Sequence, residues 1–240
     1  MLQKIYDSLL TLAYPQICQV CNESVEYSAD GVVCRRCWRK TRIFAGSETL
    51  CAKCSAFMQE KPSNFQAFCH LCDEHFYDSV RTVGLYENGL AASVLYLKRE
   101  PFVAQYLKNI FVSAFENSPF QDSTVIIPVP LSKKRFLERG FNQAEVLAEI
   151  ISKKANLKID KQSLARKIHT PLHRAAMDRR ARDLTVENAF EVTRPKLIKG
   201  EKILLVDDVF TSGATTSYCA KVLKKKGADK VYVLTLARAI

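Results

Sequence analysis

The sequence predicts an α/β domain built on a parallel sheet, preceded by a small cysteine-rich module. Three apolar runs, at 124–130, 203–206 and 231–237, are continuous instead of alternating with polar residues, which is typical of strands that helices cover on both faces. Helical patterns separate these runs, as in βαβ units. Eight of the nine cysteines come before this region and form four C-x-x-C pairs. We therefore expect two domains, at residues 1–77 and 78–240.

The first residues have an amphipathic pattern. Apolar side chains recur at helical spacing between Leu2 and Ala13, which predicts a short helix packed on its own domain, with docking on a partner or a membrane surface as the alternative. The stretch has no small-residue cleavage site, and no apolar run approaches the roughly 20 residues that span a bilayer. We expect a cytoplasmic protein that partners could bring to the inner face of the membrane.

The four cysteine pairs have the spacing of zinc ligands. Loops of about a dozen residues separate successive pairs, as in four-cysteine zinc sites, where each C-x-x-C turn supplies two thiolates. A disulfide-rich secreted module is the alternative, but it would need an export signal. We expect two structural zinc ions, in tandem ribbons or in a cross-braced arrangement, and the similar loop lengths favour tandem ribbons. The expected ligands are Cys18, Cys21, Cys34, Cys37, Cys51, Cys54, Cys69 and Cys72.

The second domain begins with a strand at 79–86. Two helices follow at 90–98 and 103–115, interrupted near Pro101, whose missing N–H disfavours a continuous helix. The prolines of the strand at 124–130 end it, and we expect the basic segment LSKKR that follows to be a loop. The remaining elements are an amphipathic helix with Ala144, Leu147, Ile150 and Ile151 facing inward, and a last strand at 231–237.

The stretch KILLVDDVFTSGATT, at 202–216, ends a buried strand with two aspartates and begins a helix that we expect to run to about Lys226. Ligands of open α/β sheets bind at the carboxyl ends of the strands, where Asp207 and Asp208 stand. The residues after them are small or hydroxylated, and they can direct backbone N–H groups and a helix N-terminus at a phosphate. The stretch therefore predicts a ligand with hydroxyls at one end and a phosphate at the other.

Two simpler interpretations compete with this site. The first is an ordinary strand, turn and helix whose aspartates cap the helix. The second is the Walker B strand of a nucleotide triphosphatase, which also needs a P-loop. The glycine pair with the P-loop spacing, Gly84 and Gly89, is followed by Leu90 and Ala91, so the phosphate-binding lysine is missing. The length and detail of the stretch favour the ligand site.

The positive charge lies in the second domain. Residues 1–80 hold eight Lys and Arg against nine Asp and Glu, so the net charge of +11 comes from the rest of the chain. It concentrates at 131–182, where fourteen basic residues stand against five acidic ones. A solvated surface explains many charge runs, but a domain with this excess also attracts polyphosphates and nucleic acid.

The stretch at 202–216 resembles the 5-phosphoribosyl-1-pyrophosphate (PRPP) signature of type I phosphoribosyltransferases, in which a hydrophobic strand, an acidic pair and a T-[TS]-G-x-T loop follow one another. The strand TVIIPVP and the basic segment after it resemble the pyrophosphate-binding region of those enzymes. With the segment ERGFNQ at 138–143 and the C-x-x-C pairs, nearly the whole chain resembles the ComF family of bacterial competence proteins. The resemblance implies a type I phosphoribosyltransferase domain behind a double zinc ribbon.

The resemblance also implies roles for the polar residues of the second domain. Asp207 and Asp208 are the implied catalytic pair and accept hydrogen bonds from the ribose hydroxyls, while Mg²⁺ bridges ribose and pyrophosphate oxygens. The implied PRPP-binding loop consists of Thr211, Ser212, Gly213, Ala214 and Thr215. The implied contacts with pyrophosphate or nucleic acid are Lys133, Lys134, Arg135, Arg139, Arg179 and Arg180.

Residues 163–190 resemble the hood and the flexible loop that close over the ligand in related transferases. The family often has a glutamine and an asparagine in this segment, where the chain has His173 and Thr185. The resemblance therefore does not define base-binding residues here.

Two functions from different classes follow from these residues. In the first, the protein binds PRPP and acts in natural competence, in the uptake or handling of transforming single-stranded DNA, alongside a cytoplasmic DNA translocase or helicase. In the second, it is an active phosphoribosyltransferase of nucleotide or base metabolism without a role in DNA. The sequence leaves open whether PRPP is turned over, because binding and transfer use the same residues.

Overall fold

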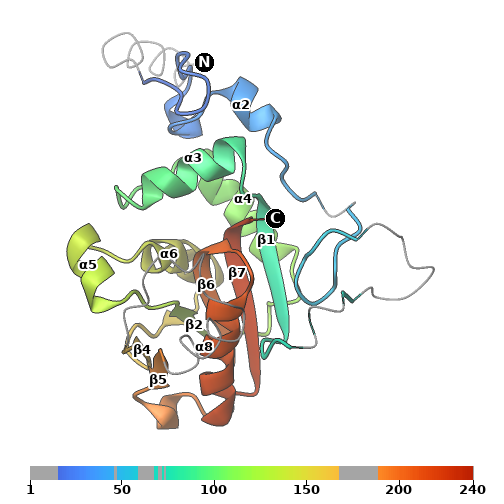
Figure 1. Ribbon diagram of the computed structural model, residues 1–240, viewed down its shortest axis with the longest axis vertical. Helices are drawn as coiled ribbons and strands as arrows, with labels where there is room; N and C mark the ends of the chain where they lie inside the picture. The colour runs from blue at the N-terminus through green and yellow to red at the C-terminus, as the bar shows by residue number, and fades with distance from the viewer. Residues whose placement is uncertain are drawn as a thin grey trace, which may run out of the picture.

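The computed structural model describes residues 16–45, 48–58, 68–69, 72, 74–167 and 189–239. Its centre is a sheet of five parallel strands in the order β1-β7-β6-β2-β3 (Figure 1). The predicted α/β class with a parallel sheet is therefore confirmed. The strands are β1 (Ser79–Leu85), β2 (Val125–Pro128), β3 (Lys158–Ile159), β6 (Lys202–Phe210) and β7 (Lys230–Arg238).

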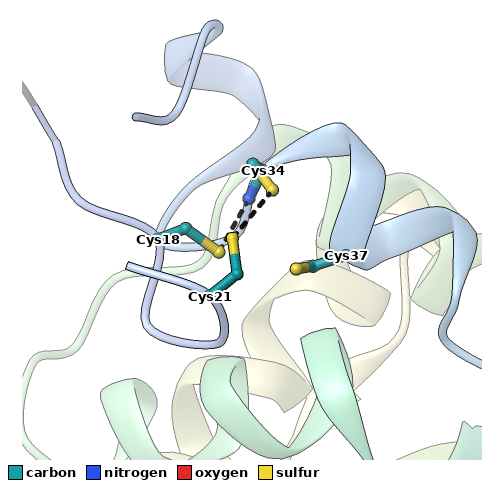
Figure 2. A group of neighbouring side chains, drawn as sticks. All are labelled: Cys18, Cys21, Cys34 and Cys37. Carbon is teal, nitrogen blue, oxygen red and sulfur yellow. Dashed lines mark hydrogen bonds between the residues drawn. The ribbon is translucent and has the colours of Figure 1, made fainter. Parts of the chain in front are cut away.

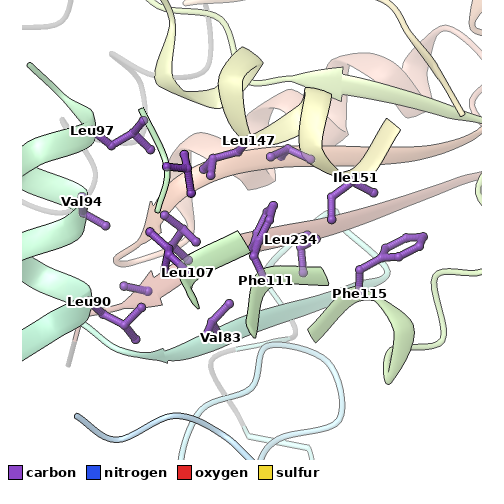
Figure 3. Packing of buried hydrophobic residues seen from close by; sticks show 14 of the residues in the cluster. Val83, Leu90, Val94, Leu97, Leu107, Phe111, Phe115, Leu147, Ile151 and Leu234 are labelled. Atoms are coloured by element: carbon purple, nitrogen blue, oxygen red, sulfur yellow. The ribbon is translucent and has the colours of Figure 1, made fainter. Parts of the chain in front are cut away.

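Helices cover both faces of the sheet. On one face lie α3 (Asn88–Leu97), α4 (Gln105–Glu116) and α6 (Gln143–Ala155), and on the other lies α8 (Ala214–Lys225). Figure 3 shows side chains of α3, α4 and α6 meeting those of the strands in one apolar core. The described shorter elements are η1 (Ser28–Asp30), α2 (Arg35–Arg39), α5 (Lys133–Arg139), η3 (Pro195–Leu197), and the antiparallel pair β4 (Leu164–Arg166) and β5 (Phe190–Val192).

Burial on both faces explains the continuous apolar run of the central strand β6. Successive side chains of a strand point to opposite faces, so Leu204 and Val206 join the core under α3, α4 and α6. Ile203 and Leu205 point the other way, into the core under α8. All four side chains are fully buried, because both faces of this strand are covered.

The two halves of the cysteine-rich region pack against different parts of the sheet domain. In the first half, the indole of Trp38 donates to the carbonyl of Asp30 at 3.0 Å and its ring contacts Tyr106 of α4. The second half is bonded to β1, since Val80 N donates to Lys53 O at 2.6 Å and Ser55 Oγ donates to Val80 O at 2.7 Å. Figure 1 accordingly shows α2 beside α3, and the cyan segment near residue 50 beside β1.

Two expectations about local structure were wrong. The basic segment expected as a loop forms α5, because Ser132 caps its first turn and Gly140, with φ +78°, ends it. The strand expected to end before the aspartates continues to Phe210, because β7 is equally long and pairs with it as far as Arg238.

Several predictions fall outside the described residues. These are the amino-terminal helix between Leu2 and Ala13 and the residues of the flexible loop, which include Arg179, Arg180, His173 and Thr185. The boundary between residues 77 and 78 stays a prediction. None of the described helices combines the length and the apolar character needed to cross a bilayer.

Candidate functional site

The two aspartates lie in the last part of β6, where the strand approaches the start of α8. Asp208 N donates to Oδ1 of Asp207 at 2.9 Å, and Val209 N donates to Oδ1 of Asp208 at the same distance. Asp208 is only 6 % exposed. Its Oδ2 lies 3.3 Å from Nζ of Lys98, which is close enough for an ion pair but is not aligned as a hydrogen bond. The acidic pair thus has one cation beside it.

The environment of Asp207 disfavours its charge. Burial and the neighbouring carboxylate of Asp208 raise the pKa of Asp207 well above its usual range, while the positive charge of Lys98 lowers it. A carboxyl pair with Asp208 buried, Asp207 half-buried and Lys98 nearby is typical of sites that bind polar ligands.

The turn after β6 leads directly into α8. Gly213 has φ +77°, and a Cβ on it would lie 2.6 Å from the ring of Phe210, so the turn requires glycine here. The carbonyl of Gly213 accepts from Ser217 N at 2.8 Å and from Thr216 Oγ1 at 3.0 Å, which starts the helix. The first N–H groups of the 12-residue helix α8 have no acceptor within the helix, so this end of α8 favours an anion.

A polar hollow joins the acidic pair to this turn. Its lining consists of Asp207, Val209, Phe210, Thr211, Gly213, Thr215 and Thr216. Three residues of the expected PRPP-binding loop and one of the two aspartates therefore line the same hollow, and the other members of the loop are their neighbours in the chain. A carboxylate, two threonine hydroxyls and the N-terminus of a helix can bind a ligand that carries both hydroxyl and phosphate groups.

Four of the six basic residues expected to contact pyrophosphate or nucleic acid lie on α5 and do not line this hollow, namely Lys133, Lys134, Arg135 and Arg139. Arg139 Nη1 donates to Gln143 Oε1 at 2.7 Å, and Lys134 Nζ lies 4.0 Å from Glu138 Oε1. The helix has no buried residue. Lys133 and Lys134 are exposed to solvent, and Arg135 is half-buried.

Sequence reasoning missed two residues beside the hollow. Lys98 follows α3 and pairs with Asp208, which is far from it in the chain. Tyr77 lies two residues before β1 and packs against Phe210 and Gly213. Neither stands in a motif. Periodicity in the sequence could not have found them, because only tertiary contacts bring these residues to β6 and to the start of α8.

Eight of the nine cysteines form two groups of four in sequential order. In each group the sulfur atoms all lie within 4.8 Å of one another, and Figure 2 shows the first group. The groups are Cys18, Cys21, Cys34 and Cys37, and Cys51, Cys54, Cys69 and Cys72. The pairing is therefore that of tandem ribbons.

The donor set of each group fits structural zinc. Four thiols converge on one point, and backbone N–H groups of Cys34 and Cys69 donate to the sulfurs of Cys18 and Cys51 at 3.3 Å. In the first group, a hydrogen bond from the backbone of Glu23 lowers the pKa of the Cys21 thiol to about 6. This favours the thiolate, which is the form that binds metal.

Comparisons with known proteins find relatives of the cysteine-rich region and of the chain as a whole. The family of the double zinc ribbon domain matches residues 9–74. The competence protein ComFC of Bacillus subtilis is 27% identical over 249 residues, which cover 93% of this chain and 95% of that protein. The chain is therefore similar to ComFC over nearly its whole length.

Two further ComF relatives extend this result. Competence protein F of Haemophilus influenzae is 27% identical over 92% of this chain and 96% of its own length. The DNA utilization protein YhgH of Escherichia coli K12 is 27% identical over 95% of this chain and its whole length. Each of these relatives extends over both the ribbons and the sheet domain, so the predicted resemblance to the ComF family is confirmed.

Solved structures similar to the chain include phosphoribosyltransferases. The glutamine PRPP amidotransferase of B. subtilis, complexed with ADP and GMP, is 16% identical over 73% of this chain and 33% of that chain, with a TM-score of 0.37. The purine phosphoribosyltransferase of Pyrococcus horikoshii is 13% identical over 57% of this chain and 89% of that chain, with a TM-score of 0.34.

Proposed function

We propose that this protein binds PRPP with Mg²⁺ in the hollow between β6 and α8, and that it acts in natural competence by handling transforming single-stranded DNA. One observation carries the proposal of the ligand: Asp207 and the hydroxylated turn at Thr211–Thr215 line the same hollow. The names of the relatives, two competence proteins and a DNA utilization protein, support the biological role.

The two ends of the hollow suit the two ends of PRPP. At the strand end, Asp207 and Asp208 accept hydrogen bonds from the ribose hydroxyls. At the helix end, the backbone N–H groups of the turn and the hydroxyls of Thr211 and Thr215 hold the 5′-phosphate. Mg²⁺, which prefers oxygen ligands, would neutralise charge on the pyrophosphate. The positive charge of Lys98 lowers the pKa of Asp207, which favours the ionised form that accepts hydrogen bonds.

The helix α5 is the proposed contact with DNA. Lys133, Lys134 and Arg135 stand beside Phe136 and Leu137, which are 46 % and 73 % exposed. Cations that pair with phosphates, next to an exposed aromatic ring on which a base can stack, are typical of single-strand binding. Arg139 extends the same charge, and Arg179 and Arg180 are proposed to add to it from the segment outside the described residues.

Isothermal titration calorimetry with PRPP and Mg²⁺ tests the ligand. The double variant Asp207→Asn/Asp208→Asn keeps the shape of both side chains and removes both charges, so it should lose measurable binding. Asp122→Asn is the matched control, because Asp122 pairs with Lys202 at the opposite end of β6. PRPP binding that is unchanged in the double variant would refute the site.

A further inference from the structure

Tyr77 is buried against the turn that we propose to bind phosphate. It is 1 % exposed, and its hydroxyl has no hydrogen-bond partner among the described residues. The same hydroxyl oxygen lies 3.2 Å from the position that a Cβ on Gly213 would take. A buried hydroxyl without a partner destabilises a fold, and such groups are concentrated at functional sites.

The second cysteine group fixes the position of this ring. Nζ of Lys53 donates to the carbonyls of Cys72 at 2.8 Å and His75 at 2.9 Å, which ties the chain before Tyr77 to the cysteine turn. The imidazole of His75 stacks on the Tyr77 ring with 5.0 Å between the ring centroids. The ring of Tyr77 also packs edge-to-face with that of Phe210, with 5.9 Å between the ring centroids.

The same segment is also bonded to α8. Phe76 N donates to Ser217 Oγ at 3.1 Å, and Ser217 N donates to the carbonyl of Gly213 at 2.8 Å. Residues 75–77 therefore connect the second cysteine group to the phosphate turn through side-chain packing and hydrogen bonds. The first cysteine group has no such connection among the described residues, since it packs with α3 and α4 on the other face of the sheet.

Anion binding gives the Tyr77 hydroxyl a partner. A trans peptide holds its N–H and C=O on opposite sides, so a peptide that turns its N–H toward a phosphate turns its C=O into the protein. A carbonyl directed inward needs a donor. At this turn, the hydroxyl of Tyr77 is a donor that lies on the inner side of Gly213 and has no other partner among the described residues.

We propose that Tyr77 is a positioning residue for the phosphate turn: its hydroxyl donates to a backbone carbonyl of residues 211–213 when an anion is bound, and the second cysteine group holds it there. The proposal rests on the proposed function of this turn. It gives the second zinc ribbon a part in ligand binding in addition to its part in folding.

The variant Tyr77→Phe tests the proposal, because it keeps the ring and removes only the hydroxyl. Removing a partnerless buried hydroxyl should leave the free energy of unfolding unchanged or higher. The affinity for PRPP with Mg²⁺, measured by calorimetry, should fall about tenfold, which is the effect of one lost hydrogen bond in the bound state. A simple packing role would instead change stability and affinity together.

The matched control is Tyr106→Phe on α4, whose ring contacts Trp38 on the other face of the sheet. This control should bind PRPP like the unaltered protein. Equal PRPP affinity of Tyr77→Phe and the unaltered protein would overturn the proposal. A weaker affinity accompanied by a lower free energy of unfolding in denaturant would overturn it as well.

A titration with ribose 5-phosphate separates this proposal from the proposed function. If the unaltered protein binds ribose 5-phosphate but not PRPP, and Tyr77→Phe weakens that binding, the positioning role stands and the choice of PRPP is wrong. If PRPP binds equally to both proteins, the ligand stands and the positioning role is wrong. If neither compound binds to the unaltered protein, both proposals are wrong.

Discussion

Lys98 Nζ lies 3.3 Å from Oδ2 of Asp208 and forms an ion pair with it. Lys98 follows α3, whereas Asp208 belongs to β6, so the contact joins two elements far apart in the chain. The charge of Lys98 lowers the pKa of Asp207, which burial and the carboxylate of Asp208 raise. The lysine therefore favours the ionised form of Asp207.

Replacing this lysine should change the pH dependence of ligand binding. In Lys98→Met, the pKa of Asp207 should rise further, so that PRPP affinity falls at neutral pH and its midpoint moves to higher pH. Lys98→Arg keeps the charge and should retain a midpoint close to that of the unaltered protein. Calorimetric titrations at several values between about pH 5 and 9 measure this midpoint of PRPP affinity. The same midpoint in all three proteins would contradict the role given to Lys98.

The raised pKa of Asp207 also makes a prediction about stability. A carboxyl whose pKa is higher in the folded than in the unfolded protein favours folding when protonated, and this contribution is lost as pH rises from the unfolded pKa through the folded one. At neutral pH, Asp207→Asn should therefore raise the free energy of unfolding, by about 1 kcal/mol. The gain should disappear at acidic pH. Urea unfolding at two pH values measures it, and a loss of stability at neutral pH would contradict the account.

A methyl group at Gly213 should damage both the fold and the site. Gly213→Ala places a Cβ 2.6 Å from the ring of Phe210 at a φ of +77°. Gly200→Ala is the matched control, because Gly200 has φ +79° and nothing within 4 Å of that position. The control should lose about 1 kcal/mol of stability from its backbone alone. Gly213→Ala should lose more and should bind PRPP more weakly, and equal losses in both variants would contradict the packing described here.

Metal removal should unfold both ribbons, and loss of the second zinc should weaken ligand binding more than loss of the first. Each structural zinc contributes on the order of 10 kcal/mol to the folding of its ribbon, so chelation should unfold both. Cys72→Ser should release one zinc and weaken PRPP binding through Tyr77. Cys37→Ser should also release one zinc but should weaken PRPP binding less. Zinc content by mass spectrometry and affinity by calorimetry test this, and equal loss of affinity would show that the second ribbon has no special role.

Charge reversal on α5 should weaken DNA binding. Lys133→Glu/Lys134→Glu removes two proposed phosphate contacts, so the slope of log affinity against log salt for single-stranded DNA should decrease by about 1.4. The ion pair between Lys134 and Glu138 is exposed, so its loss in the variant should change stability little. Lys196→Glu, on η3, is the control and should change neither affinity nor slope. Fluorescence anisotropy over a salt series measures both, and equal weakening in the two proteins would remove α5 from the proposed DNA surface.

Much of the fold followed from local patterns. The continuous run at Ile203–Val206 predicted a strand buried on both faces, and the similar cysteine spacing favoured the sequential groups that the structure has. The end of β6 was harder to predict, because the polar residues Asp207 and Asp208 suggest a turn, while pairing with β7 keeps them in the strand. Tertiary hydrogen bonding here outweighs local propensity.

The candidate site was predicted only in part for the same reason. Asp207 and the turn after it are close in the chain, so one stretch of sequence specified both. Lys98 and Tyr77 reach the site through tertiary contacts, which sequence periodicity does not encode. The segment LSKKR, expected as a loop at the ligand, forms an exposed helix because Ser132 provides a cap.

A crystal structure of the protein with PRPP and Mg²⁺ tests the central claim most directly. We expect the ribose hydroxyls at Asp207 and Asp208, the 5′-phosphate at the N–H groups of Thr211–Thr215, and the hydroxyl of Tyr77 donating to a carbonyl of that turn. A complex with PRPP bound elsewhere, or with its phosphate away from the start of α8, would contradict it.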